Sequence, residues 1–135
     1  MPGKGSQRCA RQVSIADDIR LQLARLCRSA RTRTSEYSEK APTKWQPTTL
    51  RDPRDQEGPY FTERGAWEYI AEALEGGAEV EVIELQKPPG KKAYVLHLQG
   101  VPPVKTIYVK LQLQSDKVLG RSFHESRHPS KTPDE

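Results

Sequence analysis

The feature that most constrains the fold is a series of four strand-like runs in the second half of the chain, separated by short turns. The runs are 80–85, 93–99, 106–114 and 117–124, and the third one, TIYVKLQLQ, alternates apolar and polar residues along its whole length. Such alternation is typical of a strand with one buried and one solvated face. Because consecutive strands joined by short loops pair antiparallel, the sequence predicts a four-stranded antiparallel sheet with one apolar face.

A helix that precedes the strands can cover this apolar face. Thr62 is a good N-cap, the segment ERGAWEYIAEALE places its apolar residues on one side, and Gly76-Gly77 ends it. The expected fold is therefore α+β, with one main helix packed on a four-stranded antiparallel sheet. This module is expected to span residues 59–126.

The first part of the chain has a different composition. Residues 14–30 predict an additional N-terminal helix that is amphipathic and basic, and whether it packs on the module is left open. Its arginine-rich composition is also found in organelle transit peptides, but the main expectation is a cytoplasmic protein. Only 34% of the 135 residues are hydrophobic, so we interpret residues 31–58 as a linker and residues 1–13 and 127–135 as disordered tails.

Charge is distributed unevenly along the chain. Residues 59–86 carry one basic and seven acidic side chains, whereas residues 87–135 carry nine basic and four acidic ones. A basic sheet beside an acidic helix can bind a polyanion, although solubility alone is the other interpretation. No apolar run approaches the ~20 residues of a membrane span. The two cysteines and three histidines lack the spacing of a disulfide scaffold or zinc site, so we expect no metal, cofactor or membrane partner.

Alternation also predicts the register of the strands. A two-residue loop at Ser115-Asp116 fixes the last hairpin, and pairing apolar residues with each other fixes the one before it. The expected pairs on the apolar face are Leu113–Val118, Leu111–Gly120, Val109–Ser122 and Leu98–Ile107. On the other face the expected pairs are Lys110–Arg121, Lys110–Val95, Tyr108–Phe123 and Tyr108–His97. The opposite face therefore gathers cations, aromatic rings and an imidazole.

The order of a helix followed by strands that end in IYVKLQLQSDKVLGRSFHES resembles small bacterial toxin ribonucleases. The families are the motility quorum-sensing regulator (MqsR) toxins and the wider RelE-like and barnase-like endoribonucleases. The matching motif is a Tyr-x-Lys strand, a short turn and a strand ending in Ser-Phe-His, here Tyr108, Lys110, Ser122 and Phe123, with His124 following. The resemblance covers about residues 60–126 and implies RNA cleavage without a metal and neutralisation by an antitoxin protein. The long basic N-terminal extension departs from those compact toxins.

Metal-free RNA cleavage needs a base for the 2′-OH, an acid for the 5′-oxygen and cations for the phosphorane. Lys110 and Arg121 are the candidate cations. His97 or His124 can serve as base or acid, because histidine titrates near neutral pH, and Tyr108 can donate a hydrogen bond. The candidate RNA-binding residues are Phe123, which could stack on a base, and four loop lysines, Lys87, Lys91, Lys92 and Lys105.

Two other functions remain open from the sequence. The same sheet face could belong to an RNA-binding module that does not cleave, in which case binding would be sensitive to salt. Alternatively, the basic helix could dock a protein partner. The sequence contains no nucleophile elbow, phosphate-binding loop or dinucleotide-binding glycine pattern, so other enzyme classes lack support.

Overall fold

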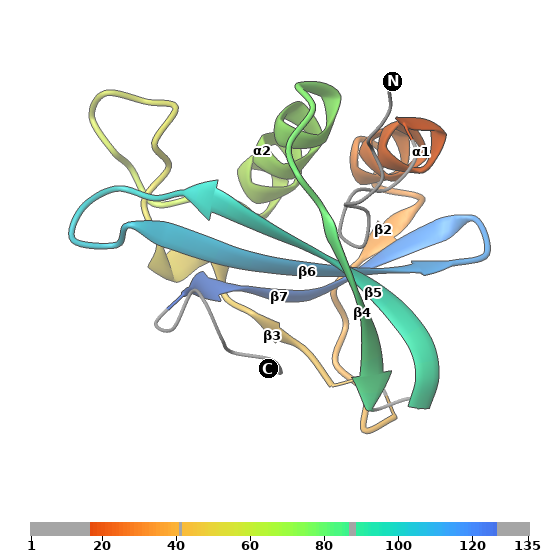
Figure 1. The fold of residues 1–135 in the computed structure, drawn as a ribbon. Helices are drawn as coiled ribbons and strands as arrows, with labels where there is room; N and C mark the ends of the chain where they lie inside the picture. Colours follow the sequence, from red (N-terminus) through yellow and green to blue (C-terminus); the bar gives the residue numbers. More distant parts are fainter. Residues whose placement is uncertain (1–16, 41, 87–88, 127–135) are drawn as a thin grey trace, which may run out of the picture.

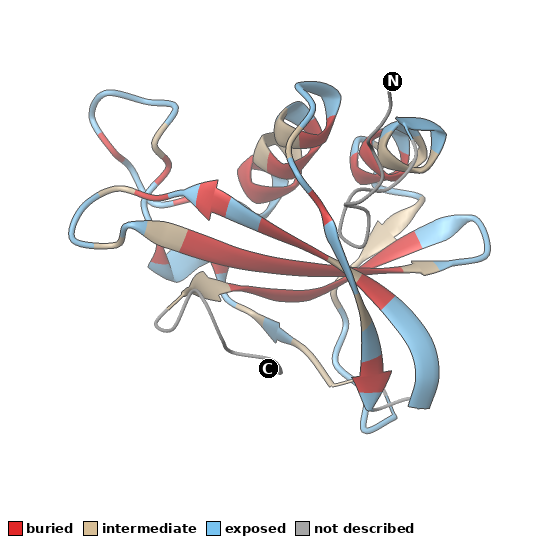
Figure 2. Cartoon of the chain, in the orientation of Figure 1, coloured by how far each residue is buried: buried red, intermediate tan, exposed pale blue. Residues whose placement is uncertain are grey.

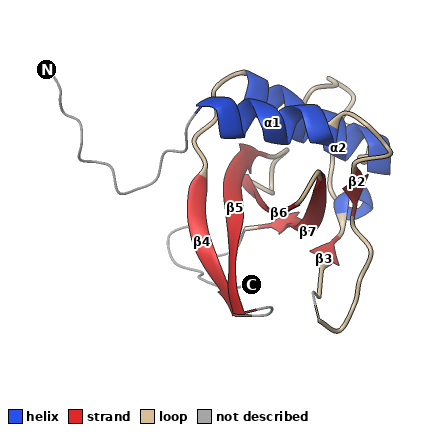
Figure 3. Cartoon of the chain, turned by 90° about the vertical axis from the view of Figure 1, so that its right-hand side faces the viewer, coloured by secondary structure: helices blue, strands red, loops and turns tan. Residues whose placement is uncertain are grey.

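The computed structural model of the protein describes residues 17–40, 42–86 and 89–126. Figure 1 shows two helices side by side over one face of a twisted sheet, and Figure 3 shows the same helices and strands as two layers. The fold is α+β, as predicted. The elements are α1 (Asp17–Cys27), β2 (Arg33–Thr34), β3 (Lys44–Trp45), η2 (Pro47–Thr49), α2 (Glu63–Glu75), β4 (Glu81–Gln86), β5 (Pro89–Gln99), β6 (Thr106–Gln114) and β7 (Lys117–Glu125).

The sheet has six strands and is mixed, in place of the four antiparallel strands that the sequence predicts. Strands β4 to β7 run antiparallel in the order β7-β6-β5-β4, as expected. The short strands β2 and β3 both pair with the outer edge of β7 and run parallel to it. The extra strands come from the segment before the predicted module.

The interpretation of residues 31–58 as a linker is therefore corrected, because this segment holds both extra strands. Trp45 on β3 pairs with Phe123, and its indole lies over Gly120, where an added Cβ would stand 2.5 Å from the ring. The indole nitrogen of Trp45 also donates to Glu63 on α2 at 3.0 Å. A strand of two residues has no alternation, and the prolines and charges of this segment resemble those of a linker. The large apolar side chain of Trp45 was the feature that indicated a folded segment.

The N-terminal helix α1 packs on α2, which answers the question that the sequence left open. The contact is strengthened at its end by Arg28, whose guanidinium makes two hydrogen bonds of 2.8 Å with Glu75 of α2. The helix ends at Cys27, three residues earlier than the expected 14–30. The expected start at Ser14 and the expected tails lie outside the described residues. The buried residues of α1 are Leu23, Ala24, Leu26 and Cys27.

Helix α2 matches its predicted limits. The Thr62 hydroxyl accepts a hydrogen bond of 2.8 Å from the Gly65 amide and so satisfies one of the free donors at the helix start. Gly77, with φ of 90°, follows the last turn, in a conformation that other residues adopt at a cost. The side that faces the sheet is apolar. Its buried residues are Gly65, Ala66, Trp67, Ile70, Ala71 and Leu74.

The core lies between the helix layer and the sheet, where Figure 2 shows buried residues on both layers. Its centre is a group of aromatic rings. Trp45 lies 4.6 Å from Trp67 and 5.4 Å from Phe123, and Phe61 lies 5.2 Å from Phe123, as centroid distances. This aromatic group joins β3, α2 and β7, so the parallel edge strand is held by the same contacts as the helix.

The register is partly as predicted. Strands β5 and β6 pair Leu98 with Ile107 and His97 with Tyr108, both as expected. Strands β6 and β7 also follow the prediction next to their turn, where Leu113 pairs with Val118 and Leu111 with Gly120. Beyond these pairs the register shifts by one residue, between Lys110 and Leu111.

This shift is a β-bulge, in which Arg121 is the extra residue. The expected pairs Lys110–Arg121, Tyr108–Phe123 and Val109–Ser122 are therefore wrong. One additional residue exchanges the faces of every later side chain in the strand, and composition carries no signal for it. The observed pairs are Lys110–Ser122, Val109–Phe123, Tyr108–His124 and Ile107–Glu125.

Candidate functional site

A row of three rings crosses the sheet on the face turned away from α1 and α2, which we call the far face. His97 of β5, Tyr108 of β6 and His124 of β7 occupy neighbouring pairing positions. The Tyr108 ring centroid lies 5.7 Å from that of His97 and 5.5 Å from that of His124. His97 is exposed, His124 is half-buried and Tyr108 is 5% exposed. A phenol thus separates two imidazoles on one face of the sheet.

Two cations lie farther along the same face. Lys110 and Gln112 follow Tyr108 at every second position of β6, so the three side chains share one side of the strand. Gln112 accepts a hydrogen bond of 3.0 Å from Arg121, which places that guanidinium on the far face as well. We call His97, Tyr108, Lys110, Arg121 and His124 together the far-face cluster.

Both cations are largely withdrawn from water. Lys110 and Arg121 are each 4% exposed. Burial lowers the pKa of Arg121, although an arginine stays charged at any physiological pH. Removing a cation from water costs free energy, and an ordinary sheet avoids that cost with apolar side chains. Polar contacts have to offset the cost of burying these two cations, and the hydrogen bond from Arg121 to Gln112 is one of them.

The bulge changes which residues belong to this cluster. It turns His124 toward Tyr108, where the expected register had Phe123. Nδ1 of His124 lies 3.0 Å from the backbone oxygen of Glu125, which orients the ring. All five residues predicted for catalysis are thus on one face, four of them at pairing positions and Arg121 at the bulge.

The prediction that Phe123 stacks on a base is wrong. The bulge turns this ring to the helix side, where it is fully buried against Trp45 and Phe61. Phe123 belongs to the core between the sheet and the two helices, so its ring lies on the other side of the sheet from the far-face cluster. The motif Ser-Phe-His therefore contributes its imidazole, and its phenyl ring stabilises the fold.

The lysines predicted to bind phosphates do not form one group. Lys91 and Lys92 are exposed at the start of β5, whereas Lys105 is exposed beyond the other end of that strand. The Gly100 amide donates to the Lys105 backbone oxygen at 3.1 Å, so Lys105 lies close to the end of β5 that carries His97. Lys87 lies outside the described residues. Lys105 is therefore the best placed of the three described lysines to extend the far-face cluster.

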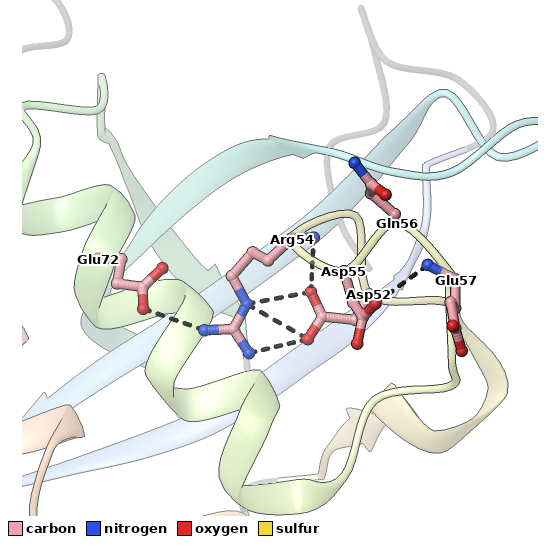
Figure 4. Close-up of a pocket in the computed structure, with 6 residues that line it drawn as sticks. All are labelled: Asp52, Arg54, Asp55, Gln56, Glu57 and Glu72. Atoms are coloured by element: carbon pink, nitrogen blue, oxygen red, sulfur yellow. Dashed lines mark hydrogen bonds and ion pairs between the residues drawn. The ribbon is translucent and has the colours of Figure 1, made fainter.

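A charged cluster that the sequence did not indicate lies where the loop 51–58 meets α2, as Figure 4 shows. Arg54 donates to Asp52 at 2.8 Å and to Glu72 of α2 at 3.0 Å. Although burial opposes ionisation of Asp52, hydrogen bonds from Arg54 hold the pKa of this carboxyl below its ordinary value. Glu72 is 18 residues from Arg54, so no local spacing marks this cluster. Its three charged side chains tie the loop 51–58 to the helix, and we assign it a structural role.

Two further kinds of chemistry have no support in the part of the chain that the structure describes. No group of three His, Cys, Asp or Glu side chains there could hold a metal ion. Burial raises the pKa of the Cys27 thiol to about 12, so this side chain stays protonated at neutral pH and is not a thiolate nucleophile. Cys9 is not among the described residues.

Comparison with known proteins adds no assignment. No family model, no curated protein and no solved structure matches the chain. Within the described residues, no helix is long and apolar enough to cross a membrane. The far-face cluster is therefore the main observation from which a function can be argued.

Proposed function

We propose that the protein is an endoribonuclease that cleaves RNA without a metal, by attack of a 2′-OH on the adjacent phosphodiester. The observation that carries the proposal is the row of His97, Tyr108 and His124, with ring centroids 5.7 and 5.5 Å apart. Two imidazoles on either side of one position supply the base and the acid that this reaction needs. Confinement to RNA follows from the chemistry, since DNA has no 2′-OH.

The surroundings of the two histidines favour different roles for them. The backbone oxygen of Glu125 is an acceptor for Nδ1–H of His124 at 3.0 Å. A proton on Nδ1 leaves Nε2 as the nitrogen that takes the proton of the 2′-OH as general base, and because this atom is buried, the proposed role requires RNA binding to expose it. His97 is exposed and, in its protonated form, can donate to the 5′-oxygen as the general acid.

The two cations and the phenol act on the phosphate. Lys110 and Arg121 oppose the negative charge that grows on the phosphorane, and electrostatic stabilisation of this kind is usually the largest contribution to catalysis. The Arg121 guanidinium is held by Gln112, so it does not have to reorganise during the reaction. Tyr108, between the imidazoles, can donate a hydrogen bond to a phosphate oxygen. The resemblance to toxin ribonucleases supports the further proposal of an antitoxin protein as partner.

The test is incubation of the purified full-length protein with a single-stranded RNA in the presence of a chelator. We expect products that end in a 2′,3′-cyclic phosphate, detected by mass spectrometry, and no cleavage of DNA of the same sequence. His97→Ala and His124→Ala are each expected to reduce the rate by about 10²–10⁴-fold, the usual contribution of a general acid or base. Lys110→Ala is expected to abolish cleavage.

A matched control separates chemistry from damage to the sheet. Gln99 is exposed on β5 two residues after His97 and faces the same side, so Gln99→Ala should leave the cleavage rate unchanged. Full activity of the His97, His124 and Lys110 variants would refute the proposal. RNA binding that weakens with salt and yields no product would instead support a module that binds RNA without cleaving it.

A further inference from the structure

The chain covers one edge of the sheet and not the other. At the first edge, β2 and β3 both pair with β7, so two separate segments lie beside that strand. At the second edge β4 is the last strand, and no segment of the described residues pairs with its outer side. Figure 3 shows β4 at the outer limit of the sheet. Alternate residues of such a strand direct their backbone N–H and C=O groups outward, where a further strand can bind them.

The regular part of this edge is short. Residues 81–84 pair with β5 without interruption, from Glu81 opposite Val95 to Glu84 opposite Lys92, and the register shifts only after Glu84. A bulge bends a strand and disturbs its pairing, so the stretch available to a further strand is 81–84.

The side chains of this stretch define which strand fits it. Glu81 and Glu84 are exposed, and between them Val82 is 38% exposed and Ile83 is half-buried. Side chains directly opposite one another on antiparallel strands interact, and opposite charges or an aromatic beside a β-branched side chain are favourable pairs. A strand with the pattern basic, apolar, apolar, basic therefore places a cation opposite each glutamate and an apolar side chain opposite each apolar residue.

The charge around the edge favours the same partner. Residues 79–86 carry three acidic and no basic side chains, and Glu79 is exposed like the two glutamates of the strand. Lys92 balances part of the charge of Glu84 across the hairpin, whereas Glu81 stands opposite the apolar Val95. Glu81 is therefore the stronger of the two anchors for a basic residue.

We propose that the outer edge of β4 binds an extended segment of another protein, which adds an antiparallel strand with the pattern basic, apolar, apolar, basic opposite residues 81–84. The backbone of β4 supplies affinity, and Glu81 and Glu84 select the partner by charge. The added strand extends the sheet in its own plane and leaves the far-face cluster uncovered. The inference therefore stands apart from the proposed cleavage of RNA.

The first experiment measures the charge preference of the edge. A short fluorescent peptide with a central Lys-Phe-Val-Lys block is titrated with the full-length protein, and binding is followed by anisotropy. A peptide with a Glu-Phe-Val-Glu block in the same flanks is the comparison. We expect the basic peptide to bind at least about tenfold more tightly, because both charge pairs change sign between the two peptides. Equal affinities, or binding of neither peptide at millimolar concentration, would overturn the proposal.

A charge reversal separates the edge from the net charge of the protein. Glu81→Lys/Glu84→Lys is expected to prefer the acidic peptide. Asp55→Lys/Glu57→Lys makes the same change of charge at two exposed positions of the loop 51–58 and should keep the wild-type preference. If both variants reversed the preference, net charge alone would explain the binding and the proposal would be wrong.

Hydrogen exchange followed by NMR locates the bound peptide. With the basic peptide present, we expect slower exchange of the outward amides within residues 81–84 and no change in β2 and β3. Protection at β2 and β3 in place of β4 would refute the site. If the outward amides of 81–84 were already slow in the protein alone, dilution would tell a second copy, whose protection is lost, from another segment of the same chain, whose protection stays. Either result would mean that the edge has a different occupant and would overturn the proposal.

Discussion

The two faces of the sheet use alternate residues of the same strands for opposite purposes. On the helix side, Val109 and Phe123 pair with each other and are fully buried among aliphatic and aromatic side chains. On the far face, the neighbouring pair joins Tyr108 to His124, and both side chains can donate or accept a hydrogen bond. Both faces contain buried positions, so burial alone does not separate core from site.

The chemical type of the buried residues distinguishes the candidate site from the core. Burying an apolar side chain stabilises a fold, whereas burying lysine or arginine costs solvation free energy. Substitutions on the helix side should therefore change stability, and substitutions on the far face should change activity. The following expectations test that division, from the largest effect on stability to the smallest.

Phe123→Ala is expected to have the largest effect. It removes a fully buried ring that contacts both Trp45 and Phe61. Deleting such a ring from a core typically lowers the free energy of unfolding by about 3–5 kcal/mol. Urea unfolding followed by tryptophan fluorescence measures the change. A loss below about 1 kcal/mol, which is typical of surface positions, would contradict the assignment of this residue to the core.

Gly120→Ala tests the contact between β3 and β7. The added Cβ would stand 2.5–2.7 Å from three atoms of the Trp45 ring, so the indole has to move away from the aromatic group. Overpacking of this kind costs about 1–3 kcal/mol in unfolding free energy. In the Trp45→Leu background the same substitution should cost less, because the two residues are in contact. Equal costs in both backgrounds, measured by urea unfolding, would show that the two side chains do not compete for space.

Asp52→Asn tests whether the hydrogen bonds between Asp52 and Arg54 stabilise the packing of the loop 51–58 on the helix layer. A hydrogen bond to a charged group contributes about 1.5–3 kcal/mol, so the variant is expected to be less stable at pH 7 by about that amount or slightly less. Because the pKa of Asp52 is lowered in the folded protein, the carboxylate stabilises the fold above the unfolded pKa of about 4 and loses this contribution as pH falls.

The same pair of proteins should therefore become more alike in acid. Urea unfolding at pH 7 and pH 3 measures the difference in stability between wild type and Asp52→Asn, which should shrink at the lower pH. Asp55→Asn, at an exposed position in the same loop, is the control and should show little difference at either pH. A difference that is the same at both pH values would mean that the charge of Asp52 contributes nothing.

His97→Ala should have the smallest effect on stability and a large one on activity. The side chain is exposed on β5, and exposed substitutions usually change unfolding free energy by less than about 0.5 kcal/mol. Under the proposed function the same variant loses about 10²–10⁴-fold in the rate of RNA cleavage. Urea unfolding and the cleavage assay give the two numbers. If His97→Ala lost stability as well as activity, the claim that far-face residues affect activity and helix-side residues affect stability would be wrong.

The sequence was sufficient for the elements that have a strong local pattern. The helix ERGAWEYIAEALE and the strand TIYVKLQLQ were predicted because periodicity and capping residues agree. The pairing of His97 with Tyr108 also follows from alternation, since that hairpin contains no irregular residue between these strands.

What could not be predicted depends on single residues and on contacts distant in sequence. One bulged residue, Arg121, moved Phe123 into the core and His124 to the far face. Strand β3 forms because the Trp45 indole fits over Gly120, 75 residues later in the chain. Neither effect leaves a local pattern. The shared face of His97, Tyr108 and Lys110 was nevertheless predicted, because the bulge does not affect their strands. His124 follows the bulge, so the expected register turned it away from Tyr108, and only the sequence motif had marked it as a candidate.

The strand order leaves the sheet with two unlike ends. One side of β7 is occupied by β2 and β3, whereas β4 is the last strand at the other end of the order. An uncovered edge strand can recruit another chain, and β4 carries an exposed Val82 that would favour this. Its exposed Glu81 and Glu84 oppose it, because two such strands would bring like charges together at neutral pH. These two acidic side chains therefore protect the protein against assembly through its sheet edge, and replacing both with glutamine would remove that protection.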